Sequence, residues 1–184
     1  QGDVEAISAL LQEGAGVDQE DNDGYTPLFV ASSKGHANAA RLLLDAGAAV
    51  DKRREGDWSP FGIACALGHL DVATLLVERG VDTNAINTCV GGMPPLLFAC
   101  RNRNLGAMRL CLEHGADVNW ANEEGGTILY DLCKNGSVDA AQLLLDKGAE
   151  VDRAPSKGRG KGCTPLYIAC RKGHVDAARL LLDN

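Results

Sequence analysis

The side chains of this chain best suited to chemistry are its seven cysteines and four histidines. A thiolate beside a histidine can act as a nucleophile, close sets of thiols and imidazoles can bind zinc, and paired thiols can form disulfides. Four cysteines follow similar apolar stretches: Cys65, Cys100, Cys133 and Cys170. At Cys65 and Cys170 the letters "IAC" are repeated. The four cysteines either build a site or fill one repeated packing position.

The spacing of the cysteines favours packing. The sequence has no Cys-x-x-Cys pair, and one thiol per recurring position cannot surround a single ion. Stacked helices lie roughly 8–10 Å apart, whereas a disulfide needs Cα atoms within about 7 Å, so neighbouring members of this column are not expected to bridge. We interpret them as small apolar residues, with Cys111 in a leucine position and Cys89 and Cys163 in loops. Unpaired thiols favour a reducing intracellular compartment, cytoplasmic or nuclear.

The histidines and one glycine-rich segment give no catalytic signature. His36, His69 and His174 each follow a turn glycine and are expected to make local turn hydrogen bonds. Near-equivalent repeated positions offer no unique Cys/His site, which would need one histidine oriented beside one activated thiol. The segment "SKGRGKGCT" departs from a phosphate-binding loop because Lys161 is followed by Gly162 rather than by serine or threonine. We expect a flexible basic loop there, and no catalytic residue, metal site or cofactor.

These residues belong to a repeating framework. Similar stretches such as "TPLFVA", "SPFGIA" and "TPLYIA" recur at steps of about 33 to 37 residues, headed by Thr26, Ser59, Pro94, Thr127 and Thr164. A hydroxyl followed by proline predicts a helix start. A second apolar helix follows each turn, and a glycine that can adopt a left-handed conformation ends it: Gly47, Gly80, Gly115 or Gly148. Two short antiparallel helices per unit are therefore predicted.

The second helices indicate how the units pack. In the helix predicted for 175–182, polar side chains occupy a narrow arc and apolar ones cover most of the remaining circumference. Such a helix must be flanked on several sides. With only 4% aromatic residues, the core must consist mainly of Leu, Ala and Val. Stacked units satisfy both observations, whereas one closed globule does not.

The segment "DNDGYTPLFVASSKGHANAARLLLDAGAAVD" resembles an ankyrin repeat, and the resemblance extends over the whole chain. It implies an all-α solenoid of stacked antiparallel helix pairs with projecting β-hairpin fingers, a protein-binding role and no catalytic residues. We expect a single domain, 1–184, that is a piece of a longer array. Its expected parts are a partial repeat, 1–18, and full repeats at 19–51, 52–84, 85–119, 120–152 and 153–184.

The resemblance also suggests a binding surface. It places the residues before the helix heads on the concave groove, as a column of Tyr25, Trp58, Met93, Gly126 and Cys163. Tyrosine and tryptophan often anchor interfaces, but Trp58 and Tyr25 could instead brace the fingers. Fingers four and six are longer than the others by two and four residues, and insertions on one edge often lie on the binding face.

Charge is distributed unevenly along the chain. Residues 1–25 contain acidic side chains and no basic ones, whereas residues 153–173 contain six cations and no acid: Arg153, Lys157, Arg159, Lys161, Arg171 and Lys172. This polarity could orient an extended ligand, although solvated loop charge explains it equally well. The net charge of -7 argues against a general nucleic-acid or anionic-membrane surface. No apolar run approaches the roughly 18 residues of a membrane span.

The sequence thus predicts a non-catalytic protein-protein interaction module that binds a protein or peptide through its concave face. The expected contact residues are Tyr25, Trp58, Met93, Cys163, Lys157, Arg159, Lys161, Arg171 and Lys172. Two alternatives stay open at this point. The chain could be the adaptor region of a larger enzyme or channel, or it could bind nucleic acid or anionic lipid through the basic sixth finger.

Overall fold

The computed structural model describes residues 4–52, 58–85 and 92–184. The chain divides into two compact units, Gln1–Gly115 and Ala116–Asn184. Helices dominate both units. The first unit contains α1 (Val4–Gln12), α2 (Pro27–Lys34), α3 (Ala37–Asp45), α4 (Pro60–Leu67), α5 (Leu70–Glu78), α6 (Pro95–Arg101) and α7 (Leu105–Glu113). The second contains α8 (Ile128–Asn135), α9 (Val138–Asp146), a 3₁₀ turn (Gly158–Gly160), α10 (Pro165–Lys172) and α11 (Val175–Leu182).

The predicted helix starts are confirmed at atomic level. The hydroxyl of Thr26 accepts a hydrogen bond from the amide of Phe29 at 3.2 Å, and that of Ser59 accepts one from Gly62 at 2.9 Å. Thr127 and Thr164 cap α8 and α10 in the same way. Pro94 heads α6 without a side-chain cap, because proline has no hydroxyl. Each cap satisfies an amide that the helix itself leaves unpaired.

The ends of the helices depend on left-handed residues, as the glycine pattern predicts. Gly47, Gly80, Gly115 and Gly148 follow the second helices with φ between 80° and 90°. After the first helices, a left-handed glycine occurs in four repeats, and the fourth repeat has Arg103 at that position, with φ 59°. A side chain with a Cβ is strained in this conformation. The fourth repeat therefore carries a local backbone cost that its neighbours avoid.

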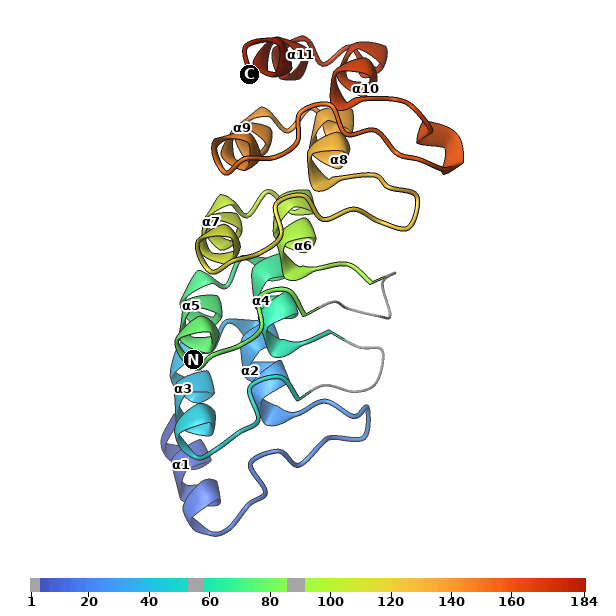
Figure 1. Cartoon of the computed structure of the whole chain (residues 1–184). Helices are drawn as coiled ribbons and strands as arrows, with labels where there is room; N and C mark the ends of the chain where they lie inside the picture. The colour runs from blue at the N-terminus through green and yellow to red at the C-terminus, as the bar shows by residue number, and fades with distance from the viewer. Residues whose placement is uncertain (1–3, 53–57, 86–91) are drawn as a thin grey trace. The chain divides into compact units, whose positions relative to one another are not determined.

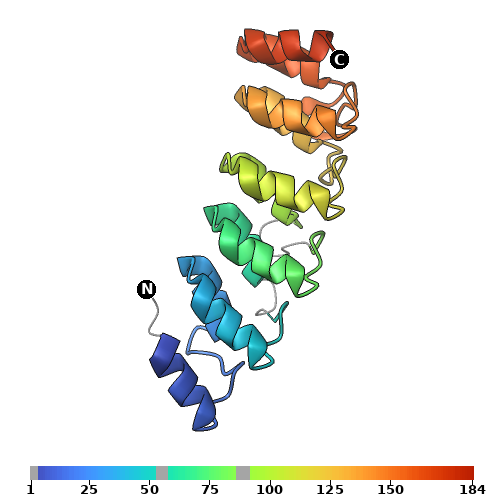
Figure 2. The same ribbon diagram turned by 90° about the vertical axis from the view of Figure 1, so that its left-hand side faces the viewer.

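In the first unit, helices stack in two layers. The first helices α2, α4 and α6 pack in a row, and the second helices α1, α3, α5 and α7 form a parallel row beside them (Figures 1 and 2). Phe61, Leu76 and Met108 are completely buried between the layers. Asp71 and Glu78 lie on the exposed face of α5, as the sequence pattern predicts. Burial of the apolar faces holds the helix pairs together.

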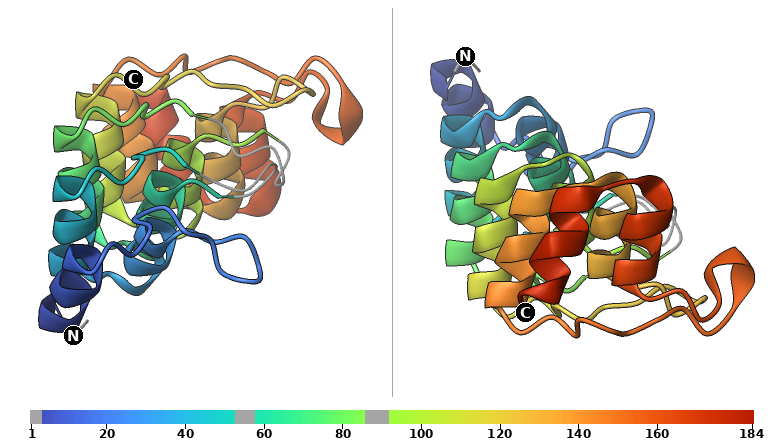
Figure 3. Two further views of the ribbon diagram at one scale, coloured as in Figure 1. Left: turned by 90° about the horizontal axis from the view of Figure 1, so that it is seen from below. Right: turned by 90° about the horizontal axis from the view of Figure 1, so that it is seen from above.

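The second unit repeats this arrangement on a smaller scale. Helix α8 packs against α9 and α10, and α11 packs against α9 and α10 (Figure 1). Ile128, Leu144, Ala169 and Ala177 are among the fully buried residues of these helices. The fifth finger closes with an isolated antiparallel bridge between Ala121 and Thr127. The sixth finger extends away from α8 and α10 (Figure 3).

Hydrogen bonds between repeats follow a pattern that the sequence analysis missed. The Nε2 atom of His69 lies 3.2 Å from the carbonyl oxygen of Ser33, and that of His174 lies 3.2 Å from the oxygen of Lys134. The local turn hydrogen bonds expected for these histidines are therefore wrong, since both partners are in the preceding repeat. Gly35 is required where His69 approaches, because a Cβ on that glycine would lie 2.6 Å from the ring.

In the fourth repeat an asparagine takes the histidine position. Asn104 donates through Nδ2 to the carbonyl oxygens of Cys65 and Ala66, at 3.0 and 2.8 Å. Both oxygens belong to the last turn of α4, where backbone carbonyls have no intrahelical partner. The Asn104 amide thus contacts carbonyl oxygens at the end of α4, as His69 contacts one at the end of α2.

Candidate functional site

The column expected to contact a partner lies directly before the helix caps. Tyr25, Trp58, Met93 and Cys163 are half-buried, and Gly126 is buried. Half-burial means that each of the four larger side chains has protein on one side and solvent on the other. The contacts on the protein side show whether each residue also contributes to packing within or between repeats.

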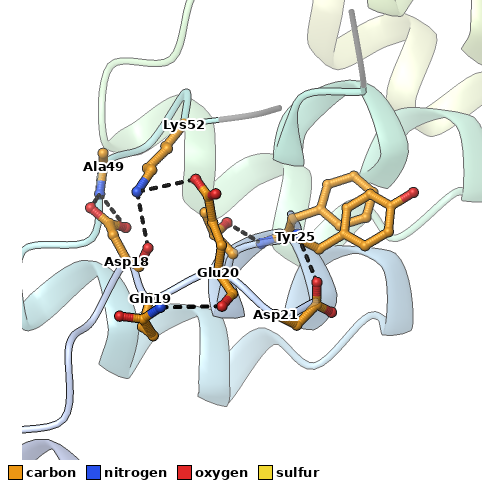
Figure 4. A network of polar contacts seen from close by, with 9 residues as sticks. Asp18, Gln19, Glu20, Asp21, Tyr25, Ala49 and Lys52 are labelled. Carbon is orange, nitrogen blue, oxygen red and sulfur yellow. Dashed lines mark hydrogen bonds and ion pairs between the residues drawn. The ribbon is translucent and has the colours of Figure 1, made fainter. Parts of the chain in front are cut away.

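Tyr25 is fixed by its own repeat. Its ring stacks on Phe29 with centroids 4.7 Å apart and an interplanar angle of 12°. Its backbone amide donates to the Oδ1 atom of Asp21 at 2.9 Å, which closes the turn of the second finger (Figure 4). Stacking within one repeat holds the ring in position and leaves part of the tyrosine exposed.

Trp58 is fixed by the next repeat. Its ring lies 4.1 Å, centroid to centroid, from that of Phe98 in α6, at an interplanar angle of 44°. Phe98 is only 6% exposed, so the indole covers a core residue. Trp58 consequently has a bracing contact in addition to its exposed surface. No periodic pattern identified Phe98 as its partner, because the contact joins residues 40 positions apart.

Met93 and Cys163 have weaker polar contacts. Nη1 of Arg101 lies 3.2 Å from the Met93 sulfur. The Cys163 thiol lies 3.9 Å from the carbonyl oxygen of Lys161. Burial raises the pKa of the neighbouring Tyr130 hydroxyl, and the nearby Cys163 adds to this increase. The phenol therefore stays protonated at neutral pH and can donate a hydrogen bond.

The basic sixth finger is a hydrogen-bonded turn, where a flexible loop was expected. The backbone amides of Ser156 and Lys157 donate to the carbonyl oxygen of Glu124 in the fifth finger, at 2.8 and 3.1 Å. Gly162 donates to the carbonyl oxygen of Pro155 at 2.9 Å, which closes the loop around the 3₁₀ turn. The longer finger is thus anchored to its neighbour at its base.

Two glycines allow the sixth finger to approach the fifth repeat closely. A Cβ on Gly158 would collide with the carboxylate of Glu124, and one on Gly160 would lie 2.8 Å from the hydroxyl of Tyr130. The cations Lys157, Arg159 and Lys161 alternate with these glycines and are all exposed. Arg171 and Lys172, at the end of α10, are exposed as well. The unit therefore presents the five expected cations to solvent.

The acidic end of the chain is partly engaged in structure. Both carboxylate oxygens of Asp18 lie 3.2 Å from the amide of Ala49, and Lys52 donates to the carbonyl oxygen of Asp18 at 3.0 Å. Lys52 also pairs with Glu20 at 3.4 Å (Figure 4). These contacts tie the second finger to the third. The Glu20 carboxylate is therefore paired with a cation and the Asp18 carboxylate is engaged by a backbone amide, which reduces the acidic surface that the sequence suggested.

A cavity of about 450 Å³ lies beside Tyr25 in the first unit. Its walls come from α1, α2 and α3 and are mostly apolar, with Leu10, Val30 and Leu43 among the lining side chains. Leu10 and Val30 are exposed. Walls of this kind suit a hydrophobic side chain better than a polar metabolite.

The cysteines have the character of packing residues in most positions. Cys65, Cys100, Cys111 and Cys133 are buried, Cys163 is half-buried and Cys170 is exposed. Cys89 lies outside the described residues. Burial raises the pKa of Cys133 to about 12, which keeps this thiol protonated. In the described part of the chain, no three His, Cys, Asp or Glu side chains gather as a metal ion would require.

Comparison with known families accounts for this geometry. A model described as ankyrin repeats (3 copies) matches residues 1–87 and 81–155, and a model described as ankyrin repeats (many copies) matches residues 129–182. The chain belongs to the ankyrin-repeat family. A comparison with curated proteins finds no match. The ankyrin solenoid predicted from the repeats is thus confirmed by both the helices and the family models.

Membership in the ankyrin-repeat family sets the general role of the chain. Ankyrin repeats generally serve as protein-protein interaction modules and are typically non-catalytic. No helix within residues 4–52, 58–85 and 92–184 has the length and apolar character that a membrane crossing requires.

Proposed function

We propose that this chain is a non-catalytic module that binds a protein partner through the side bearing its fingers and first helices. The observation that carries the proposal is the partial exposure of Tyr25 and Trp58, two aromatic rings each held by a second ring. Rings held in place lose little conformational freedom on binding. Tyrosine and tryptophan are also the residues that most often dominate binding energy.

The partner's chemistry follows from the second unit. Lys157, Arg159 and Lys161 project from a turn anchored on Glu124, so their positions are restricted before a partner arrives. An acidic protein segment complements this charge. Exposed charges of this kind act mainly by accelerating association and selecting orientation. Because the aromatic pair and the basic finger lie in different units, each is treated as a separate contribution.

The proposal is tested by capturing a partner and then measuring its affinity directly. The chain is immobilised, bound proteins are identified by mass spectrometry, and each candidate is purified and titrated against the wild type. Titrations are repeated with Trp58→Ala and with a triple charge reversal at Lys157, Arg159 and Lys161. The control is a triple charge reversal at Arg41, Arg109 and Lys147, which are exposed. It changes the net charge by the same amount, but on the second helices α3 and α7 and at the end of α9.

A binding loss in the first two variants that is absent from the control supports the proposal. Equal losses in all three variants, or none, would show that the partner uses another face. Duplex DNA, single-stranded RNA and anionic vesicles are titrated in parallel. Tight binding to one of these, with a steep loss of affinity in salt and no acidic protein partner, would favour the alternative function for the basic finger.

A further inference from the structure

Two buried thiols from different repeats lie in contact in the first unit. The sulfur atoms of Cys65 in α4 and Cys111 in α7 are 3.8 Å apart, although the residues are separated by 46 positions. Both side chains are 0% exposed. Cys65 belongs to the first helix of repeat three and Cys111 to the second helix of repeat four. The contact therefore joins two successive repeats.

The repeat register shows that packing alone does not demand this pair. The position of Cys111 in the second helix is taken in the other full repeats by leucine: Leu43, Leu76, Leu144 and Leu181. All four leucines are buried. In the second unit, the pair at the corresponding positions is Cys133 and Leu181. A leucine thus fills this space elsewhere, and repeat four differs by supplying a second thiol.

We propose that Cys65 and Cys111 form a modification site at which a hydroperoxide converts the thiol pair into a disulfide between repeats three and four. One thiolate attacks the terminal peroxide oxygen and the O–O bond breaks, so that a sulfenic acid forms; the alkoxide, or hydroxide in the case of hydrogen peroxide, leaves and takes up a proton. The sulfur of the second thiol then attacks the sulfenic sulfur, the S–O bond breaks and water is released. In sum, two thiols and one hydroperoxide yield one disulfide, one alcohol or water from the peroxide, and one further water.

The geometry favours the second step over further oxidation. For a disulfide, the sulfur atoms must come roughly 1.8 Å closer than in the structure. A reacting group held in contact has a very high effective concentration. Once either residue is a sulfenic acid, the neighbouring thiol is therefore its first available nucleophile. The pair is expected to stop at the disulfide, which thiol reductants reverse.

The surroundings make the first step slow. The hydrogen bond with Cys111, together with burial, raises the pKa of Cys65. Little thiolate exists at neutral pH, and peroxide must reach a site without solvent contact. Oxidation therefore depends on local opening of the stacked helices. We expect it to be slower than at the exposed Cys170 and faster in low concentrations of urea, which raise the open population.

The test begins with a variant in which Cys89, Cys163 and Cys170 are replaced by serine, so that the four buried cysteines are the only thiols. This protein is exposed to hydrogen peroxide, the remaining thiols are alkylated, and peptides are analysed without reduction. A peptide pair linked through Cys65 and Cys111 is expected, lighter by two hydrogen atoms than the separate peptides. Dithiothreitol should restore both thiols.

Three further variants in the same background isolate the effect of proximity. Cys111→Leu restores the residue found at this position in the other repeats, and Cys111→Ser keeps a small side chain if leucine is not accommodated. In both, Cys65 should accumulate as a sulfenic acid that dimedone traps. Leu181→Cys supplies a thiol at the corresponding position near Cys133, and a second linked peptide pair, joining Cys133 to the introduced thiol, is the expected result.

Two outcomes would overturn the proposal. One is a native protein whose Cys65 and Cys111 remain thiols at every peroxide dose and exposure time that leaves the protein folded. The other is linkage of Cys65 to Cys100 or Cys133 as often as to Cys111, since random pairing would reflect unfolding rather than the contact. Neither result depends on whether the module binds a protein partner.

Discussion

The indole of Trp58 covers the ring of Phe98, which lies in the first helix of the following repeat, with centroids 4.1 Å apart. A residue expected at a binding surface is therefore also part of the packing between repeats. Its two roles can be separated by substitution, because a smaller aromatic ring keeps the contact with Phe98 and gives up exposed surface.

Trp58→Phe and Trp58→Ala form a pair of variants for this purpose. We expect Trp58→Ala to weaken partner binding by about 2 kcal/mol or more and to lower the free energy of unfolding by about 1 kcal/mol, since an aromatic pair is lost. Trp58→Phe should weaken binding while stability changes by less than about 0.5 kcal/mol. Calorimetric titration and urea unfolding measure the two effects. If Trp58→Ala unfolds repeat three, Trp58 is a brace rather than an anchor.

Charge reversal at Lys157, Arg159 and Lys161 should act on the rate of association. We expect a drop in the association rate of roughly tenfold at low salt, with little change in the dissociation rate. The drop should shrink as salt is raised, because exposed charges are screened over about 10 Å at 0.1 M ionic strength. Stopped-flow or surface-based kinetics at several salt concentrations provide the measurement. If the variant changed only the dissociation rate and left the association rate as in the wild type, this role would be contradicted.

Arg103→Gly should stabilise the protein. Arg103 has φ 59° at a position where other repeats have glycine, so the substitution removes the strain of a Cβ in the left-handed region. The gain expected in the free energy of unfolding is about 1 kcal/mol. Arg103→Ala, which removes the charge and keeps the Cβ, should give no such gain. Equal stabilisation by both variants in urea would assign the effect to charge.

Asn104→Ala should weaken the junction between repeats three and four. The variant leaves the carbonyl oxygens of Cys65 and Ala66 without their amide donor. A loss of about 1–2 kcal/mol in unfolding free energy is expected for these two bonds. Asn104→His introduces the side chain that bonds in the same way at His69 and His174, and it should retain most of the stability. A histidine variant as unstable as the alanine variant would show that the position is not interchangeable.

The raised pKa of Cys133 links stability to alkaline pH. Burial raises its pKa to about 12, whereas a thiol in the unfolded chain titrates near its ordinary value of 9.0. The folded state keeps the proton longer, so this stability is complete below pH 9 and is lost as pH rises through 12. Between pH 9 and 10.5 the wild type should lose up to about 1.4 kcal/mol per pH unit more than Cys133→Ala. Parallel slopes in urea unfolding would exclude this linkage.

Much of the fold could be predicted from local sequence. The cap at Thr26 and the left-handed glycine at Gly47 depend only on residues within a few positions, so their types and spacing suffice. The partner of Trp58 and the thiol contact of Cys65 could not be predicted in this way. Both contacts depend on how one repeat packs on the next. Because the fingers differ in length, the number of residues between two contacting side chains does not identify the contact.

For the candidate binding residues, exposure could be predicted from the sequence but their contacts within the fold could not. The exposure of Lys157, Arg159 and Lys161 agrees with a charged loop. Its anchoring on Glu124 could not be predicted, because a backbone carbonyl has no signature in the sequence. Likewise, the contacts of Lys52 with the Asp18 carbonyl oxygen and the Glu20 carboxylate join two fingers and could not be predicted from the sequence. They reduce the acidic surface at this end of the chain.

The hydrogen bonds that His69, Asn104 and His174 make to the preceding repeats give the array a direction. The helices α2, α4 and α8 each begin with a hydroxyl cap from their own repeat, but their last turns bond to a side chain that belongs to the repeat after them. Removal of a later repeat therefore frees the last turn of the helix before it, whereas removal of an earlier repeat leaves the later helix ends intact. Fraying consequently spreads towards the amino terminus more readily than away from it.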